Sequence, residues 1–269
     1  MKYFVEGISY HVEVCGEGDP LLLLHGFTGK GSNWSSYCSS LGEKAKLIMP
    51  DIIGHGLTDS PDNSQRYNIE SVATDLFFII SQLGYEKIDI HGYSMGGRLA
   101  LSMALLFPER VRKLILESSS PGLSSELDRD ERRASDYLLA QAIKEKGIEE
   151  FVDHWETIPL FQSQKALPDQ VKSSIREQRI TNNPIGLANS LIGMGTGSQP
   201  SYWDRLREVE ADVLIMVGEY DEKFCRIAFE MQKSLKYGKI YKVPNCGHAI
   251  HVEQPEKFGT IVNEFLLNT

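Results

Sequence analysis

The sequence predicts an α/β fold in which a mostly parallel central sheet carries helices on both faces and a helical insertion interrupts the chain. Short apolar segments, each ending in a polar or glycine-rich turn, alternate with segments whose apolar residues recur with a helical period. The apolar segments disappear between about residues 121 and 199, where charged helical sequence takes their place. Together these observations favour a doubly wound sheet with one inserted helical unit.

The predicted strands are mostly continuous apolar runs, which are typical of strands buried on both faces of a parallel sheet. They cover residues 21–26, 46–51, 88–94, 113–119, 212–221 and 239–248. Residues 3–14 alternate around Glu6-Gly7 instead and predict an antiparallel hairpin. Ligands bind at the carboxyl ends of the strands in such sheets, so the turns that follow these runs are the candidate site.

Helical segments separate the predicted strands at residues 69–84, 96–107, 224–236 and 255–267. The insertion, residues 121–199, falls between two strands of the sheet. We therefore expect a core made of residues 1–120 and 200–269, with the insertion lying over the carboxyl edge of the sheet as a helical cap.

Composition excludes several classes of partner. The chain has 269 residues, a formal net charge of −9 and no Lys/Arg-rich block, which argues against nucleic-acid binding. No apolar run is long enough to cross a bilayer, and the first residues do not resemble a signal peptide. We expect a cytoplasmic protein without a membrane partner, either a monomer or a weak homo-oligomer, that acts on a small molecule.

The cysteines and the missing cofactor motifs support the same expectation. Cys15, Cys38, Cys225 and Cys246 lie far apart, with neither CxxC nor metal-ligand spacing, which predicts reduced thiols. No phosphate loop, dinucleotide fingerprint or metal-ligand cluster is visible in the sequence, so we predict no cofactor and no bound metal.

The segment Gly92-Tyr93-Ser94-Met95-Gly96 fits the pattern G-x-S-x-G between a predicted strand and a predicted helix. Glycines at these places let the backbone turn sharply and expose the serine at the start of the helix. A serine hydroxyl is a weak nucleophile or base unless a histidine activates it and an acid orients that histidine. The pattern predicts that Ser94 is the centre of a catalytic site.

His248 and Asp221 are the predicted partners of Ser94, because each follows a late strand and their chain order is serine, acid, histidine. Glu117, which also ends a strand, is a rival acid, and His251 is a rival histidine. The remaining histidines outside the glycine-rich loops are interpreted as surface or packing residues: His11, His91 and His154.

Two glycine-rich loops complete the predicted site. In LHGFTG, after the first core strand, the amide of Phe27 could converge with that of Met95 on a developing oxyanion. We expect His25 to brace this loop. His55, in the loop DIIGHGLTDS, is expected to be structural at the floor of the site.

The G-x-S-x-G turn, the two glycine-rich loops and the segments that carry Asp221 and His248 together resemble the α/β-hydrolase superfamily over nearly the whole chain outside the insertion. Finer blocks resemble the 2-succinyl-6-hydroxy-2,4-cyclohexadiene-1-carboxylate (SHCHC) synthase family of menaquinone biosynthesis. They are GYSMGGR (92–98), SSPGL (119–123), ERRASD (131–136), FVDHWETIPLF (151–161), QRITNNPIG (178–186) and GTGSQPSYW (195–203). The resemblance implies an α/β-hydrolase fold with a helical cap.

The resemblance also implies a carbon–oxygen lyase that uses no water. It would remove a ring proton from 2-succinyl-5-enolpyruvyl-6-hydroxy-3-cyclohexene-1-carboxylate and expel pyruvate. The family uses a serine, histidine and aspartate, which match Ser94, His248 and Asp221. Its substrate-binding residues match Tyr93, Arg98, Arg132, Trp155 and Arg179 of this sequence.

Helical spacing supports one of these matches independently. Arg98 is four residues after Ser94 and therefore lies on the same helix face, where an arginine fork can bind a carboxylate through two parallel hydrogen bonds. For the contact matched to Arg132, Arg133 remains a competitor. The alternative function is a carboxylesterase or carbon–carbon bond hydrolase that acts on an acidic substrate.

Overall fold

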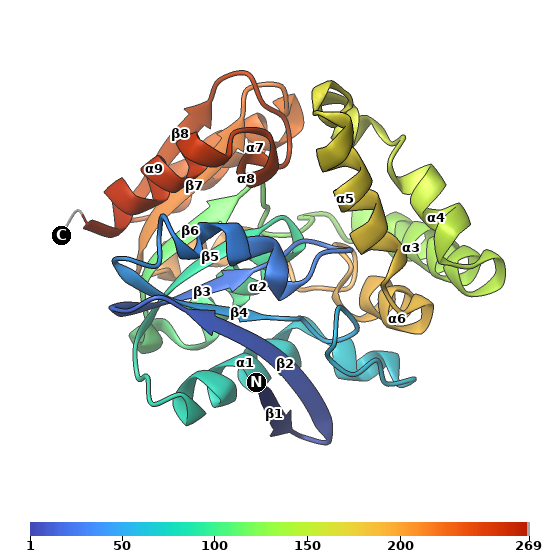
Figure 1. Cartoon of the computed structure of the whole chain (residues 1–269), viewed down its shortest axis with the longest axis horizontal. Helices are drawn as coiled ribbons and strands as arrows, with labels where there is room; N and C mark the ends of the chain where they lie inside the picture. The colour runs from blue at the N-terminus through green and yellow to red at the C-terminus, as the bar shows by residue number, and fades with distance from the viewer. Residues whose placement is uncertain (268–269) are drawn as a thin grey trace.

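The computed structural model describes residues 1–267, whose strands form a sheet in the order β1-β2-β4-β3-β5-β6-β7-β8 (Figure 1). The strands are β1 (Lys2–Val5), β2 (Ile8–Cys15), β3 (Asp19–Leu24), β4 (Ala45–Pro50), β5 (Ile88–Tyr93), β6 (Val111–Glu117), β7 (Asp212–Gly218) and β8 (Gly238–Val243). The β1–β2 and β2–β4 pairs are antiparallel, and the other neighbouring pairs are parallel. The predicted mostly parallel sheet is confirmed.

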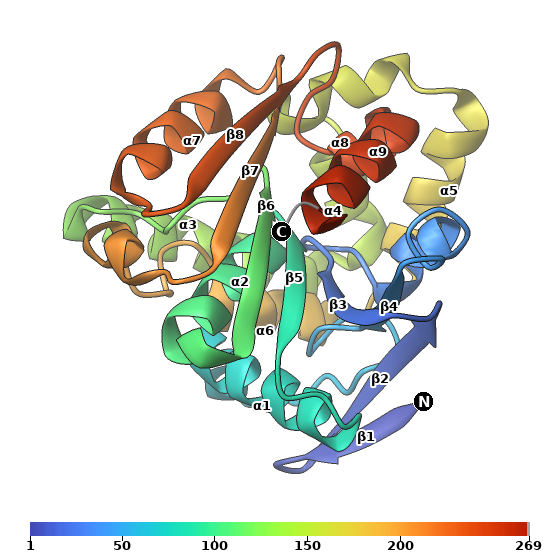
Figure 2. The same cartoon turned by 90° about the vertical axis from the view of Figure 1, so that its left-hand side faces the viewer.

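Helices cover both faces of this sheet (Figure 2). The α-helices are α1 (Ile69–Gln82), α2 (Met95–Leu106), α3 (Glu126–Lys146), α4 (Ile148–Trp155), α5 (Asp169–Ile180), α6 (Pro184–Met194), α7 (Glu222–Ser234), α8 (Ile250–Glu253) and α9 (Pro255–Leu267). The 3-10 helices are η1 (Gly31–Cys38), η2 (Ser64–Tyr67), η3 (Pro108–Arg110), η4 (Pro159–Ala166) and η5 (Trp203–Glu208).

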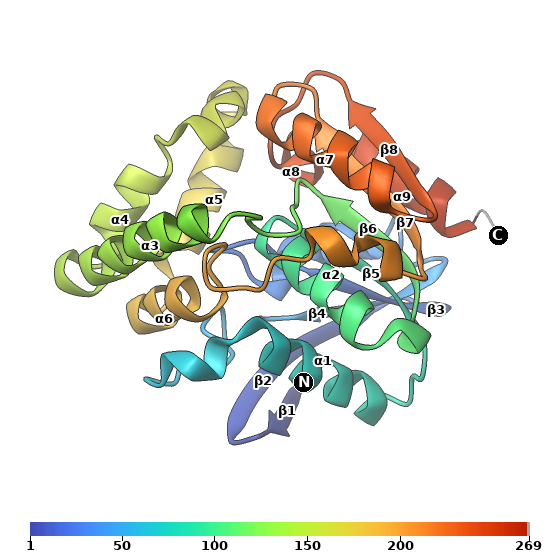
Figure 3. The same cartoon turned by 180° about the vertical axis from the view of Figure 1, so that it is seen from behind.

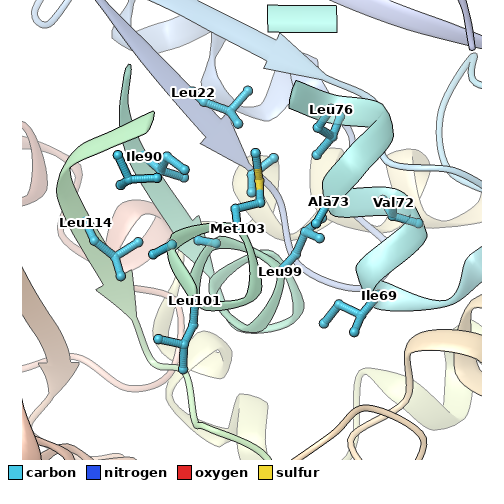
Figure 4. Close-up of a cluster of buried hydrophobic side chains, with 14 of the residues drawn as sticks. Leu22, Ile69, Val72, Ala73, Leu76, Ile90, Leu99, Leu101, Met103 and Leu114 are labelled. Atoms are coloured by element: carbon cyan, nitrogen blue, oxygen red, sulfur yellow. The ribbon is translucent and has the colours of Figure 1, made fainter. Parts of the chain in front are cut away.

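Alternate side chains of the strands pack against different helical layers. Leu22 and Ile90 join a buried cluster with Leu99 and Met103 of α2 and with residues of α1 (Figure 4). Leu21 and the other β3 side chain that points to the same face belong to a second buried cluster, together with residues of η1 and α9. Burying each leucine contributes about 1.5–3 kcal/mol, so the strands and the start of α2 are held firmly from both sides.

The insertion, residues 121–199, contains α3 to α6 and η4, which lie together at one side of the sheet (Figure 3). It has a small apolar cluster of its own, made by Ala140, Ile143, Phe151, Val152, Leu187, Ala188 and Leu191. Phe27 of the core packs against this cluster. The boundaries given above for core and cap stay a prediction.

The cysteine prediction is wrong for one pair. Cys15 and Cys38 form a disulfide with a Cα–Cα distance of 5.9 Å, whereas Cys225 and Cys246 are free thiols. Cys15 is the last residue of β2 and Cys38 the last of η1, and η1 packs against β2. Packing therefore brings together two thiols that lie 23 residues apart in the sequence.

In residues 1–267, every helix is too short or too polar to cross a lipid bilayer.

Candidate active site

Ser94 occupies the sharp turn between β5 and α2, with backbone angles φ 51° and ψ −106°. Glycines make this turn possible, because a Cβ on Gly92 would lie 2.3 Å from the carbonyl oxygen of Gly96. A Cβ on Gly96 would in turn lie 2.4 Å from the carbonyl oxygen of Leu24, on the neighbouring strand. The strain of the turn is held by β5 and α2, which places the serine hydroxyl at the carboxyl edge of the sheet.

The structure brings the three predicted catalytic side chains into one hydrogen-bonded line. His248 Nε2 lies 3.0 Å from Ser94 Oγ, and His248 Nδ1 lies 2.6 Å from Asp221 Oδ2. Asp221 also caps α7, because its other oxygen accepts a hydrogen bond from the amide of Phe224 at 3.2 Å. Asp221 and His248 are both buried. One carboxylate oxygen is thus anchored at a helix start while the other orients the histidine ring.

Glu117, the rival acid, faces different partners. Its Oε2 atom lies 3.0 Å from His91 Nε2, and its Oε1 atom lies 2.8 Å from His251 Nδ1. Burial alone would raise the pKa of Glu117, but the two histidines bring the pKa of its carboxyl below the ordinary value. His251 is therefore paired with Glu117, while the Ser94 hydroxyl faces His248.

The loop that follows β3 lies on the other side of Ser94. Phe27 and Met95 both line the cavity at Ser94, and Met95 is the first residue of α2, where helix amides have no partner within the helix. Thr28 has a positive φ of 70°, and its carbonyl oxygen accepts a hydrogen bond from Asn182 Nδ2 at 3.0 Å. The insertion thus contacts the loop that carries the predicted oxyanion donor Phe27.

Two buried histidines support this part of the core. His25 Nε2 accepts a hydrogen bond from the amide of Ile52 at 2.9 Å, as expected of a residue that braces the loop. Burial lowers the pKa of His25 to about 4 and that of His55 to about 3, so both rings are neutral at pH 7. His55 Nδ1 lies 3.0 Å from the carbonyl oxygen of Ile53.

A cavity of about 190 Å³ lies at Ser94 between the core and the insertion. Its lining includes Ser94, His248, Arg98 and Arg132. Arg132 Nε also donates to Asp136 at 2.8 Å, whereas Arg133 is paired with Glu126, with Asp130 and with the carbonyl oxygen of Gly197. Of the two competing arginines, Arg132 lines the cavity.

Arg98 is a buried cation one helical turn beyond Ser94. Its Nη1 donates to the carbonyl oxygen of Met194 at 2.7 Å and to Gln199 Oε1. Burial, and then the nearby Arg132, lower the pKa of Arg98 to about 10, which still leaves the guanidinium charged at pH 7. Because both bonds use Nη1, the hydrogens on Nε and Nη2 can bind a ligand.

Arg179 lies at a neighbouring, smaller cavity of about 60 Å³, which shares Phe27, Tyr93 and Phe161 with the cavity at Ser94. Its guanidinium stacks over the ring of Phe161, 5.0 Å from the ring centre, and its Nη1 lies 3.4 Å from Glu156 Oε1. The structure therefore separates Arg179 from Arg98 and Arg132, and Tyr93 borders both spaces.

Trp155 lines the cavity at Ser94 and packs edge-on against Phe27, with ring centres 5.4 Å apart. Its indole Nε1 is buried and, among residues 1–267, finds no hydrogen-bond partner. A buried donor of this kind needs a partner, and a bound ligand could supply one.

Sequence reasoning missed several residues of this cavity. Lys223, two positions after Asp221, lines it, as do Ser118, Ser119 and Ser120 at the end of β6. The available signals were the segment ESSS, which begins with the last residue of β6, and the segment DEKF, which begins shortly after β7. Within residues 1–267 no cluster of three or more histidine, cysteine or acidic side chains could hold a metal ion.

Comparison with known proteins assigns the family. The alpha/beta hydrolase fold family matches residues 19–255. A Bacillus subtilis protein provisionally named SHCHC synthase is 48% identical over 97% of this chain and 96% of its own length. The chain belongs to the SHCHC synthase family of α/β hydrolases. The predicted fold and the predicted family are confirmed.

This chain is also similar to a solved structure and to a relative that is named as a hydrolase. The structure of MenH from S. aureus is 36% identical, with a TM-score of 0.91, and the match covers 95% of this chain and 97% of that one. The 2-hydroxy-6-oxo-2,4-heptadienoate hydrolase of Pseudomonas putida is 27% identical over 97% of this chain and 93% of its own length. The fold thus also occurs in a relative named as a hydrolase, so the cavity has to decide the reaction.

Proposed function

We propose that this protein is an SHCHC synthase, a lyase of menaquinone biosynthesis that eliminates pyruvate from 2-succinyl-5-enolpyruvyl-6-hydroxy-3-cyclohexene-1-carboxylate. One observation carries the proposal beyond the family: the hydrogen-bonded line of Ser94, His248 and Asp221 opens into a cavity lined by the cations Arg98 and Arg132. A substrate with several carboxylates fits such a cavity, because an arginine fork binds a carboxylate through two parallel hydrogen bonds.

Elimination needs a base at the acidic ring C–H and stabilisation of the anion that forms. In our proposal His248 accepts the hydroxyl proton of Ser94 while Ser94 Oγ takes the ring proton. The electron pair of the broken C–H bond forms a ring double bond at C2–C3, the existing C3–C4 double bond moves to C4–C5, and the C–O bond from C5 to the enolpyruvyl group breaks. The leaving enolpyruvate takes up the proton that His248 received and becomes pyruvate, which returns Ser94 and His248 to their starting states, so no water is consumed and no acyl-enzyme forms.

The surrounding groups supply charge stabilisation and orientation. The amides of Phe27 and Met95 are the proposed oxyanion donors, and such a donor contributes about 3 kcal/mol to transition-state stabilisation. The substrate carboxylates are held by Arg98 and Arg132, and an arginine fork fixes the orientation of each carboxylate that it binds. Trp155 Nε1, buried without a protein partner in the described chain, would donate to a substrate oxygen.

Tyr93 and Arg179 border the adjoining small cavity, and we propose that they contact the part of the substrate that extends into it. Their joint lining of that cavity supports this role. Residues 121–199 act as the cap in this scheme, with residues 1–120 and 200–269 as the core. The expected cytoplasmic location stays part of the proposal, although the Cys15–Cys38 disulfide removes the reduced-thiol argument for it.

A purified-protein assay tests the proposal. Freshly prepared enolpyruvyl substrate should yield equal amounts of pyruvate and ring diene, with p-nitrophenyl esters turned over poorly. Ser94→Ala should abolish pyruvate release, whereas replacing the exposed Ser174 with alanine should not. Rapid ester hydrolysis without pyruvate release would instead favour the carboxylesterase alternative, and a trapped serine ester during turnover would overturn the role of Ser94 as a base.

A further inference from the structure

Glu253, the last residue of α8, is absent from the mechanism above but contacts the loop that carries His248. Its Oε2 atom accepts a hydrogen bond from the amide of Gly247 at 2.7 Å, and its Oε1 atom accepts a longer one from the amide of Ala249 at 3.4 Å. Both neighbours of His248 in the chain are therefore bound to one carboxylate. Hydrogen bonds to a carboxylate are stronger than those to a neutral acceptor, so Glu253 holds the backbone on both sides of His248.

The same carboxylate also contacts the insertion. Ser163, in η4, donates its hydroxyl hydrogen to Glu253 Oε1 at 3.0 Å. Phe161 of η4 lies against His248 itself, with ring centres 6.2 Å apart. Glu253 thus joins η4 of the insertion to the loop on which the catalytic histidine lies.

Packing at Gly247 makes this contact tight. A Cβ on Gly247 would lie 2.1 Å from Ser163 Oγ, far inside the closest approach of two such atoms. On the core side, a Cβ on Gly218 would lie 1.9 Å from the carbonyl oxygen of Gly247. The peptide next to His248 is therefore held between the end of β7 and the insertion, with no space for a further carbon atom.

We propose that Glu253 is a positioning residue, and that Ser163 docking on Glu253 and Gly247 holds His248 in line with Ser94. The position of the insertion then controls the competence of the catalytic histidine as well as the shape of the cavity. This inference rests on the proposed function, because it describes regulation of the same site. A shift of about 1 Å in a catalytic group can cost on the order of 100-fold in rate, so a small movement of η4 is sufficient.

Substitution of Glu253 tests the hydrogen bonds. Glu253→Gln replaces one acceptor oxygen with an amide nitrogen, so at least one of the Gly247, Ala249 and Ser163 donors loses its partner. We expect kcat for pyruvate release to fall by about 10- to 100-fold with KM changed less than about threefold, the pattern of a lost orientation rather than lost binding. Glu256→Gln, which removes an exposed carboxylate in α9, is the matched control.

A steric rescue tests the docking contact. Gly247→Ala should push against Ser163 Oγ and lower kcat by at least about tenfold. Ser163→Gly alone loses the hydrogen bond to Glu253 without any clash, so it should lower kcat less, and the double variant should recover to the kcat of Ser163→Gly alone. Gly259→Ala is the matched control, because its Cβ would meet no atom closer than 3.7 Å. Circular dichroism and the melting temperature establish that each variant is folded.

The outcomes separate the two proposals. If the wild-type protein releases no pyruvate, the proposed function fails and the inference fails with it. If the wild type is active but Glu253→Gln keeps its kcat within about twofold, or Gly247→Ala is not rescued by Ser163→Gly, the positioning role is overturned and the function stands.

Discussion

Replacing Arg98 with alanine is the sharpest test of how this cavity recognises its substrate. The guanidinium is buried, lines the cavity at Ser94 and gives only Nη1 to the protein acceptors, the Met194 carbonyl oxygen and Gln199 Oε1. Its Nε and Nη2 hydrogens are the ones available to a carboxylate. Arg98→Ala removes that fork and leaves Ser94, His248 and their contacts unchanged.

We expect Arg98→Ala to lower both kcat/KM and the free energy of unfolding. Losing a charge-assisted hydrogen bond to a substrate carboxylate costs about 1.5–3 kcal/mol, which corresponds to a fall in kcat/KM of about 10- to 150-fold. The substitution also leaves the Met194 carbonyl oxygen and Gln199 Oε1 buried without their donor, at a cost of about 1–3 kcal/mol each in the free energy of unfolding. Arg98→Lys keeps the charge but replaces the planar fork with a single ammonium, so we expect it to recover only part of both losses.

The assay is pyruvate release followed with lactate dehydrogenase and NADH, with urea unfolding measured in parallel. Arg207→Ala, which removes an exposed arginine of η5, is the matched control and should change neither quantity. A kcat/KM for Arg98→Ala within twofold of the wild-type value, in a folded protein, would refute the assignment of Arg98 to a substrate carboxylate.

Three further predictions follow from buried or bonded groups. The free energy of unfolding should fall as the pH drops from 6.5 toward 4, because His25 and His55 become protonated in the unfolded chain while their rings stay neutral in the folded protein. Each histidine contributes about 1.4 kcal/mol per pH unit, so His55→Asn should reduce the slope measured by urea unfolding by that amount. Asn182→Ala should lower kcat by about tenfold while KM changes little, because the oxyanion loop loses its bond to the insertion; an unchanged kcat would contradict this role. Reducing the Cys15–Cys38 disulfide should lower the free energy of unfolding by about 2–4 kcal/mol, and a Cys15→Ser/Cys38→Ser variant that unfolds like the oxidised protein would exclude that contribution.

The sheet and the serine turn were predictable because local sequence decides them. Apolar runs such as LLLLHG are stable only when both faces of the strand are buried. The glycines around Ser94 are required because a Cβ atom at these positions would collide with backbone oxygen atoms. The chain order of Ser94, Asp221 and His248 was enough to predict that these side chains would lie close together, since each follows a strand of the same sheet edge. The relative position of the arginines was not predictable, because whether Arg179 shares a cavity with Arg98 depends on how α5 packs over the core.

The disulfide and the contacts of the insertion lay beyond sequence reasoning for a related reason. Cys15 and Cys38 meet because η1 packs against β2, an arrangement that the spacing of cysteines does not encode. Ser163 reads as an ordinary polar residue, and Asn182 stands in the block QRITNNPIG without a role of its own. Their importance becomes visible only when the structure places one against the Thr28 carbonyl oxygen and the other against Glu253.

These two contacts bear on how a fold shared with hydrolases can support an elimination. The turn at Ser94 and the line through His248 to Asp221 are compatible with ester hydrolysis or with proton abstraction, so they do not choose between the reactions. The insertion supplies Arg132 to the cavity and hydrogen-bonds both to the oxyanion loop and to the carboxylate beside His248. In our proposal, substrate recognition and the alignment of the catalytic groups both depend in part on the insertion, so a change in its position would alter both together.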